Sequence, residues 1–376
     1  MKLLINSSTL KGTGVVQVAS SFINECKTIE GNEYIVFMSP SVSKNVKVET
    51  FPSNFKFYEF GKYSLYSIKG RADLKKMKQI ESEEHPDAVF SVFGPSLWRP
   101  KAPHLMGFAY PYYVYHDSPL FDMLTLKEKM QARIKEIIHM YMLKHDGDYY
   151  VCETDDVAER LCSMYGINQN KVYRAYNTAS SVFLDYKATE ELRHDNEFRF
   201  FTLCSPYKHK NMAILNKVIP LLKQHRVGKD IRFYTTFSDK AFKETFDEQV
   251  RDYIVNVGPQ SVSDCPKLIS QCDALFLPTL LECYSASYPE AMCLRKPIIT
   301  SDLPFATTVC KDSAIYFEPL NPDQITNVIV ELVTNESKRK NLIEKGVARL
   351  NEFGTAHDRA ELYVSICSRI IKNNVK

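Results

Sequence analysis

Residues 273–302, DALFLPTLLECYSASYPEAMCLRKPIITSD, predict a buried strand, a polar turn, a helix and a second strand. The apolar run Ala274–Pro278 has the length and composition of a strand, and Pro297–Thr300 has the same character. Between them a helix opens near Pro289. A strand, a helix and a further strand in this order are typical of a parallel α/β sheet.

Two carboxylates stand in this stretch with seven residues between them. Glu282 lies in the polar turn and Glu290 in the first turn of the helix. A carboxylate near a helix start is stabilised by the helix dipole. Open α/β folds bind their ligands at the carboxyl ends of the strands. The sequence therefore predicts a binding site around these two glutamates.

Composition narrows the class of protein. At 376 residues the chain is long enough for two domains. A content of 44% hydrophobic and 25% charged residues is that of a soluble globular protein. The net charge of +3 is too weak to indicate nucleic acid as the main partner. No apolar run reaches the roughly 18 residues that a membrane-spanning helix needs.

The ten cysteines are scattered, and no two form a CxxC pair. Structural zinc sites and disulfide frameworks both need tighter clusters. The pattern favours free thiols in a reducing compartment, so we expect a cytoplasmic protein.

Strands and helices alternate along the chain, and the rhythm breaks once, in the polar stretch after residue 176. Each half opens with a strand, a loop bearing glycine or lysine and an amphipathic helix. We therefore expect two facing Rossmann-like domains with a cleft between them. The predicted parts are a first domain at 1–176, a linker at 177–197, a second domain at 198–355 and a C-terminal helix at 356–376, which could pack back on the first domain.

The first loop contains Gly12 and Gly14, between a strand and a helix. A nicotinamide-dinucleotide fingerprint would need a third glycine where Gln17 stands, and an acid at the end of the second strand, which is absent. The loop thus disfavours an oxidoreductase. Two interpretations stay open: the glycines serve a tight turn, or they let the backbone approach a phosphate.

A second loop follows the first strand of the second half and reads SPYKHKN, residues 205–211. Its two lysines, Lys208 and Lys210, precede a helix, and ammonium groups beside a helix N-terminus suit a diphosphate. In a parallel sheet this loop faces the same edge as the Glu282 turn. A solvated basic loop is the alternative.

The chain resembles a known family in these same segments. The pattern P-x-x-x-E-C-Y-S-A-S-Y-P-E-A-M-C-L-R-K-P-I-I resembles the E-x7-E signature of retaining glycosyltransferases of family 4, which have the GT-B fold. Lys210-Asn211 resembles the Lys-Asn pair of that family. The segments Val151–Asn177 and Gly258–Cys272 also resemble it, whereas the resemblance is weak before about residue 145.

The resemblance implies roles for individual residues. Glu290 would hold the ribose hydroxyls of a nucleotide-sugar, Lys210 the leaving diphosphate, and Glu282 the donor sugar. The loop at Gly12–Gly14 would close over the phosphate, so the first domain would bind the acceptor and the second the nucleotide-sugar. The family requires no metal, and no cofactor is expected.

The chain also departs from the family pattern. Cys204-Ser205 stands where a Gly-Arg pair is common, and Lys208 is the candidate replacement for the missing arginine. The turn that is usually E-G-F-G has no glycine here. The histidine of the N-terminal domain is best matched by His116, followed by Asp117. The remaining residues predicted to contact the donor are Ser205, Cys283, Tyr284 and Ser285.

The sequence thus predicts a metal-independent retaining hexosyltransferase that uses a nucleoside-diphosphate sugar and a saccharide or lipid-linked saccharide acceptor, in surface polysaccharide or glycan synthesis. Alternatives are a nucleotide-sugar epimerase or hydrolase of the same fold, or a non-catalytic homologue that binds sugar nucleotides. The N-terminal half is rich in aromatic residues, which suit either a core or an acceptor site. A basic run leaves open a peripheral contact with an anionic membrane at its inner face: Lys69, Arg71, Lys75, Lys76 and Lys78.

Overall fold

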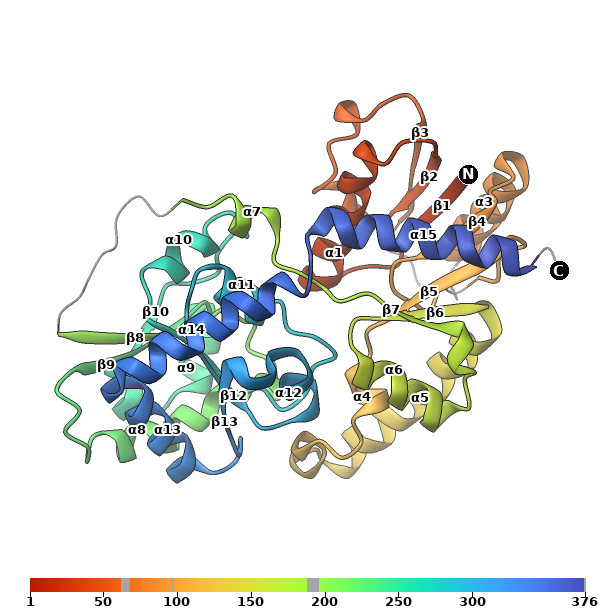
Figure 1. Ribbon diagram of the computed structural model, residues 1–376. Coiled ribbons are helices and arrows are strands. Elements are labelled where there is room, and N and C mark those ends of the chain that lie inside the picture. Colours follow the sequence, from red (N-terminus) through yellow and green to blue (C-terminus); the bar gives the residue numbers. More distant parts are fainter. Residues whose placement is uncertain (62–67, 97, 188–195, 375–376) are drawn as a thin grey trace. The chain divides into compact units, whose positions relative to one another are not determined.

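The computed structural model describes residues 1–61, 68–96, 98–187 and 196–374. The chain divides into two compact units (Figure 1). Unit 1 comprises Met1–Val114, Thr125–Asn177 and Thr355–Lys376, and unit 2 comprises Tyr115–Leu124 and Thr178–Gly354. Of the predicted linker, residues 188–195 lie outside the described residues.

One segment differs from the predicted boundaries. Tyr115–Leu124, predicted as part of the first domain, belongs to unit 2. The Ser118 hydroxyl donates a hydrogen bond to the Leu280 carbonyl at 2.7 Å. The ring of Tyr115 packs edge-on against Phe305, with the ring centroids 6.0 Å apart. These long-range contacts attach the segment to unit 2, and no local pattern in the sequence indicates them.

Unit 1 is built on a parallel sheet of seven strands in the order β3-β2-β1-β4-β5-β6-β7. The chain runs outward from β1 to β3 and then returns to β4 beside β1, so the order reverses between β1 and β4. The strands are β1 (Lys2–Ser7), β2 (Glu33–Met38), β3 (Phe55–Glu59), β4 (Ala88–Ser91), β5 (His104–Phe108), β6 (Tyr149–Cys152) and β7 (Val172–Arg174).

The sequence analysis did not predict β3. Its residues, FKFYE, are among the aromatic residues of the N-terminal half, for which the sequence allows either a core or an acceptor site. In the structure Phe55 stacks on Tyr34 of the neighbouring strand at 4.5 Å, and Phe57 packs against Phe51. These aromatic side chains therefore fill the core at one edge of the sheet. Two further aromatic residues of this region, Tyr63 and Tyr66, lie outside the described residues.

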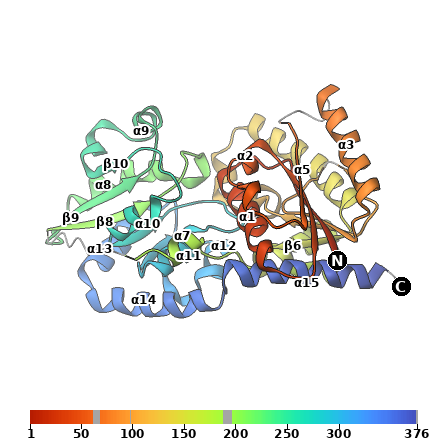
Figure 2. The ribbon, with the colours of Figure 1, turned by 90° about the horizontal axis from the view of Figure 1, so that it is seen from above.

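Helices pack against this sheet, and the last helix of the chain is one of them. α15 contacts α1 and β4, and both views show α15 beside α1 (Figures 1 and 2). The ring of Tyr363 in α15 packs against Phe22 and Phe90. The helices of unit 1 are α1 (Thr13–Glu25), α2 (Pro40–Ser43), α3 (Ile68–Glu84), α4 (Pro111–Val114), α5 (Leu126–Asp146), α6 (Asp155–Tyr165) and α15 (Ala356–Asn374), with 3-10 turns at Cys26–Thr28, Val48–Thr50 and Gln169–Lys171.

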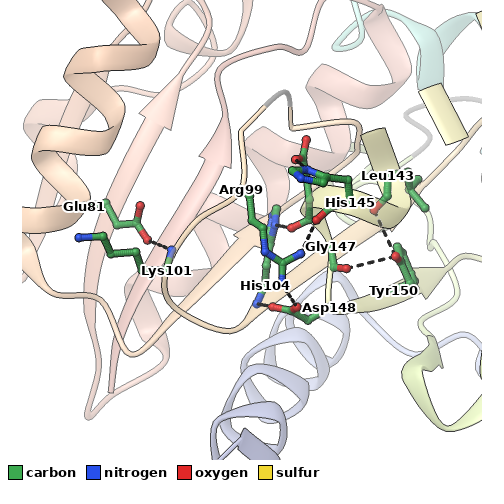
Figure 3. Close-up of polar contacts among 10 residues, drawn as sticks. Glu81, Arg99, Lys101, His104, Leu143, His145, Gly147, Asp148 and Tyr150 are labelled. Carbon is green, nitrogen blue, oxygen red and sulfur yellow. Dashed lines mark hydrogen bonds and ion pairs between the residues drawn. The ribbon is translucent and has the colours of Figure 1, made fainter. Parts of the chain in front are cut away.

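A buried histidine joins β4, β5 and the end of α5 in unit 1 (Figure 3). The ring of His104 is fully buried, with Nε2 2.8 Å from the Ser91 hydroxyl and Nδ1 2.7 Å from the Asp146 carbonyl. Asp148 accepts hydrogen bonds from the His104 amide at 3.1 Å and from Arg99 at 2.8 Å. Burial lowers the pKa of His104 to about 4, so the ring is neutral at physiological pH.

Unit 2 is built on a parallel sheet of six strands in the order β10-β9-β8-β11-β12-β13. Here too the order reverses, between β8 and β11. The strand–helix–strand order predicted for residues 273–302 is present. The strands are β8 (Glu197–Thr202), β9 (Asp230–Thr235), β10 (Ile254–Asn256), β11 (Ala274–Leu277), β12 (Ile298–Ser301) and β13 (Ala314–Phe317).

The helices of unit 2 are mostly short. One of them ends at Thr245, where Phe246 takes an extended conformation and buries its ring against Phe237 and Phe242. The helices are α7 (Ser181–Leu184), α8 (Leu215–Leu222), α9 (Asp239–Thr245), α10 (Cys265–Ser270), α11 (Ser287–Cys293), α12 (Pro304–Cys310), α13 (Pro322–Thr334) and α14 (Glu336–Asn351), with 3-10 turns at Pro119–Met123, Lys208–Lys210, Met212–Ile214, Glu248–Tyr253 and Lys311–Ser313.

Across the described ranges, no helix is both long and apolar enough to cross a membrane. All ten cysteines are free thiols, and most of them are buried.

Candidate active site

Two loops meet where the strand order of unit 2 reverses. One follows β8 and carries Lys210 in a 3-10 turn, and the other follows β11 and carries Glu282. β8 and β11 are adjacent and parallel, so both loops leave the same edge of the sheet. In open α/β sheets this reversal is where ligands bind. The prediction that the lysine loop and the Glu282 turn share an edge is confirmed.

The side chains of Lys210 and Glu282 form an ion pair, a contact that the sequence analysis did not predict. Only 16% of the lysine side chain and 14% of the glutamate side chain are exposed. Burial alone would lower the pKa of Lys210, but the Glu282 carboxylate outweighs it and raises that pKa. Lys210 is therefore a cation at any physiological pH.

Further contacts fix the geometry of this pair. The Leu280 amide donates to the His209 carbonyl at 2.7 Å. The Thr279 hydroxyl lies 3.1 Å from both that carbonyl and Glu282 Oε1. Asn211 has the left-handed φ of 55°, which asparagine tolerates better than most residues, and its side-chain amide donates to the Pro319 carbonyl at 2.9 Å. The lysine loop is thus held in place from both sides.

Glu290 lies in the first turns of α11 and has a different environment. Within the parts of the chain that the structure describes, its carboxylate makes no hydrogen bond and no ion pair. Burial raises the pKa of Glu290 to about 8. Its neighbours include the thiols of Cys265 and Cys293, whose pKa values are raised by burial and then by this carboxylate. Glu290 is therefore a largely buried acceptor that lacks a donor.

The turn that follows Glu282 is packed rather than open. Cys283, Tyr284 and Ser285 are 5%, 9% and 5% exposed. The ring of Tyr284 packs edge-on against Phe353, and the Ser285 carbonyl accepts from the Tyr288 amide at 3.2 Å. Side-chain packing therefore shapes this turn in place of the glycines of the family pattern.

Two residues predicted to bind the donor do not join the pair. Ser205 is exposed in the loop after β8. Lys208 is also exposed, and its Nζ donates to the Met123 carbonyl at 2.7 Å. Lys208 thus connects the lysine loop to the segment Tyr115–Leu124.

His116 and Asp117 lie in the same segment. His116 is exposed, and its ring lies edge-on to Phe121 at 6.0 Å. Asp117 lines a cavity of about 30 Å³ together with Leu280 and Phe305. Ser118, which follows directly, bonds Leu280, two residues before Glu282. The structure therefore places His116 on a segment that contacts the Glu282 turn, within unit 2.

Gly12 and Gly14 lie in unit 1, at the start of α1 after β1. Gly12 caps the helix with φ −82°, and Gly14 is its second residue. A Cβ at Gly14 would meet no atom of the described chain within 4 Å, and one at Gly12 would make only an ordinary contact with Val15 at 3.7 Å. Neither backbone conformation nor packing requires glycine here. This disfavours the tight-turn interpretation of the loop.

Sequence reasoning missed two residues that organise the site. Thr279 is fully buried and orients Glu282, and Ser118 attaches the His116 segment. The position of Thr279 at the end of β11 was an available signal. Among the described residues, no group of three or more His, Cys, Asp or Glu side chains is placed to hold a metal ion.

Comparisons with known proteins bear on the family and the fold. Residues 189–349 match the family described as Glycosyl transferases group 1. No curated protein matches the sequence.

Several solved structures share the fold. A glycosyltransferase from Rickettsia africae ESF-5 is 15% identical, with a TM-score of 0.76 over 99% of each chain. Alr3699/HepE of Anabaena, solved with UDP and glucose, is 12% identical, with a TM-score of 0.72 over 98% of this chain and 99% of that one. The sucrose-phosphate synthase of Thermosynechococcus elongatus is 11% identical, with a TM-score of 0.73 over 99% and 100%.

The two parallel-sheet domains are those of the GT-B fold, and the matched region contains β8 through most of α14, with both Lys210 and Glu282. Residues 189–349 form a glycosyl transferases group 1 domain, and the chain as a whole has the GT-B fold seen in solved glycosyltransferases.

Proposed function

We propose that this glycosyltransferase moves a hexose from a nucleoside-diphosphate sugar to a hydroxyl of a saccharide or lipid-linked saccharide acceptor, with retention of the anomeric configuration and without a metal. The observation that carries the proposal is the different state of the two glutamates. Glu282 is paired with Lys210, whereas the Glu290 carboxylate has no donor among the described residues.

Glu290 is suited to a vicinal diol. A carboxylate offers two acceptor oxygens, so it can receive both hydroxyls of a ribose. An unpaired buried carboxylate is costly, and a ligand that supplies two donors removes that cost. The complex of HepE with UDP and glucose supports a nucleoside diphosphate as the ligand class for this fold.

Lys210 is suited to the diphosphate. It is a buried cation at a strand end, and the Lys208–Lys210 turn precedes the helical segment that begins at Met212. An arriving diphosphate would share the ammonium group with Glu282, while Thr279 continues to hold the carboxylate. A cation placed before the reaction stabilises the charge that develops on the leaving group.

In the proposed reaction the bond between the anomeric carbon and the diphosphate oxygen breaks, and the acceptor oxygen bonds to the same face of that carbon. The acceptor proton passes to a phosphate oxygen of the departing diphosphate. No protein nucleophile is needed, so Glu282 orients the sugar and Lys210 carries the charge. A lipid-linked acceptor would bring the chain to the cytoplasmic face of a membrane, in glycan or polysaccharide synthesis.

A ligand screen followed by a transfer assay tests the proposal. Thermal shift against a panel of nucleoside diphosphates and their sugars identifies the donor, since a ligand at a hundred times its Kd adds about 2.7 kcal/mol of stability. The selected donor is then incubated with candidate acceptors, with and without EDTA. We expect acceptor-dependent release of the nucleotide, unchanged by EDTA, and a product of retained configuration by NMR.

Three other outcomes contradict the proposal. Rapid donor consumption without an acceptor would indicate a hydrolase or epimerase. Nucleotide binding without turnover over the whole panel would indicate a non-catalytic homologue. An inverted product would leave the transferase but refute the retaining mechanism.

A further inference from the structure

The long helix α5 carries a face of large apolar side chains that are mostly exposed. Of the thirteen large hydrophobic side chains that are exposed within the described ranges, six lie on this one helix. They are Leu126 (82% exposed), Met130 (63%), Ile134 (55%), Ile137 (58%), Ile138 (45%) and Tyr141 (71%).

Their spacing places them on one face. Steps of three and four residues separate the members of the row, with Ile137 and Ile138 side by side, so they share a stripe along the helix. From Leu126 to Tyr141 the stripe is about 22 Å long, at the usual rise per residue. The opposite face is buried through Met140 and Leu143. Scattered exposed apolar residues are ordinary, but a continuous stripe marks an interaction surface.

Basic side chains lie along and beside the stripe. Lys127, Lys129, Arg133, Lys135 and Lys144 are all exposed. Glu128 is the only exposed carboxylate of the helix, and it is engaged in capping the helix start at Thr125.

Among these cations, only Arg133 is balanced by a buried acid of α5. Glu136 binds Arg133 at 2.6 Å and accepts from the Tyr165 hydroxyl at 2.7 Å. Lys127, Lys129 and Lys135 have no ion pair within the described residues. The rim of the stripe is therefore strongly positive.

We propose that this face of α5 docks on an anionic lipid bilayer, with the stripe among the acyl chains and the lysines at the headgroups. An amphipathic helix with an apolar face and a rim of lysine and arginine is the form that binds in the plane of such a surface. α5 is already folded, with a capping box at Thr125, so docking needs no coupled folding. In Figure 1 the helix lies at the lower side of unit 1, with α4 and α6 beside it.

A second copy of the chain fits this surface less well. In a two-fold dimer the same patch meets itself, which would bring the exposed lysines of the two copies together. Anionic headgroups instead supply the opposite charge along the whole rim. The charge pattern therefore favours the bilayer.

The basic run on α3, which the sequence analysis considered for membrane contact, lacks the apolar component. Its buried positions include Met77 and Ile80, and no large apolar side chain of its described part is exposed. The exposed cations Arg71, Lys75 and Lys78 therefore form a matched control of equal charge in the same unit. Lys69 belongs to the same run, but its side chain lies outside what the structure describes.

The first test is co-sedimentation of the full chain with vesicles of phosphatidylcholine alone, or with roughly a third phosphatidylglycerol. We expect binding only to the anionic vesicles, weakened by salt. The triple variant Lys127→Gln/Lys129→Gln/Lys135→Gln should bind about a hundredfold more weakly. Ile134→Ser/Ile137→Ser should lose at least about tenfold. Arg71→Gln/Lys75→Gln/Lys78→Gln should bind like the unaltered chain.

A second test reports insertion directly. The chain has one tryptophan, Trp98, which is 3% exposed and gives a constant background. Tyr141→Trp places a reporter on the stripe, and Leu362→Trp places one at an exposed apolar position of α15. We expect a blue shift and quenching by brominated lipid for the first variant and neither for the second.

Circular dichroism melts confirm that each variant is folded. The inference is overturned if the unaltered chain ignores anionic vesicles, or if the α3 variant loses binding while the α5 variants keep it. It is also overturned if the α5 substitutions change only the oligomeric state, since the stripe would then be a contact between copies. None of these readouts depends on sugar transfer, so failure here is distinct from failure of the proposed function.

Discussion

Lys210 and Glu282 form an ion pair between the loops that follow two adjacent parallel strands, β8 and β11. The pair joins residues that are 72 positions apart in the chain. It lies where the strand order of unit 2 reverses, so the sheet itself determines where the charges meet.

Removing the cation should affect stability and transfer separately. Lys210→Met leaves the mostly buried Glu282 without its partner and should destabilise unit 2 by about 2 kcal/mol, between the values for exposed and fully buried pairs. Transfer should slow by about a hundredfold or more, because the leaving diphosphate loses its cation. Urea unfolding and kcat measure the two effects. Lys210→Met/Glu282→Gln should recover stability but not activity; recovery of both would contradict the assigned role.

Donor affinity should depend on Glu290. Glu290→Ala should raise the Kd for the nucleoside diphosphate by about 10- to 100-fold, the range for charge-assisted hydrogen bonds, with a smaller effect on kcat. Binding should also release protons near neutral pH, because ribose hydroxyls stabilise the ionised carboxylate. Calorimetry in buffers of different ionisation enthalpy measures both. Glu344→Gln on the exposed side of α14 is the control. An equal loss of affinity in both variants would refute the role of Glu290 in donor binding.

The same carboxylate should make the ligand-free protein less stable at higher pH. The pKa of Glu290 is raised to about 8 in the folded state, above its ordinary 4.5. Between these values the folded chain binds more protons than the unfolded one, so stability falls as pH rises from about 4.5 to 8. Glu290→Gln should remove this component and raise the Tm at pH 8 by roughly 2–4 °C per kcal/mol recovered. A difference in Tm between Glu290→Gln and the unaltered chain that stays the same at every pH would contradict this prediction.

The variant Gly14→Ala tests whether the loop at Gly12–Gly14 takes part in transfer or has only a structural role. The new Cβ meets no described atom within 4 Å and φ is not positive, so α1 should gain about 0.5–1 kcal/mol of stability. If the loop approaches a phosphate, transfer should nevertheless slow. Gly166→Ala is the matched contrast, because Gly166 has φ +63° and should lose stability. A Gly14→Ala enzyme with full activity would return the loop to a purely structural role.

His104 should make unit 1 sensitive to acid. Its pKa is lowered to about 4 by burial, below the ordinary 6.5. Between these values the unfolded chain binds more protons, so stability falls as pH drops from about 6.5 to 4, by up to about 3 kcal/mol. His104→Gln should flatten this dependence, whereas His225→Gln, on the surface, should not. Denaturant midpoints at pH 7 and pH 5 test the prediction.

Much of the fold could be read from local patterns. The apolar runs that became β1, β2, β8 and β11 have the length of buried strands, and their alternation with helices indicates parallel sheets. The edge shared by Lys210 and Glu282 follows from topology alone. In contrast, β3 is an edge strand whose aromatic residues alternate with polar ones, and its apolar signal was read as a cluster.

Features that depend on long-range contacts could not be predicted. Tyr115–Leu124 joins unit 2 through Ser118 and Leu280, which are 162 residues apart in the chain. The ion pair of Glu282 and the lack, among the described residues, of a partner for Glu290 are likewise consequences of side-chain packing. The E-x7-E spacing makes these two residues look equivalent, and only their surroundings distinguish them.

The place of α15 has a consequence for how the protein is made. Tyr363, Ile366, Cys367 and Ile370 belong to the same core as β1 and α1, although they are near the end of the chain. On the ribosome, unit 2 can be completed while unit 1 still lacks this helix, which reverses the usual order in which N-terminal domains mature first. The nascent first half would expose the groove for α15 until that helix has been synthesised, so chaperone binding during translation should concentrate there.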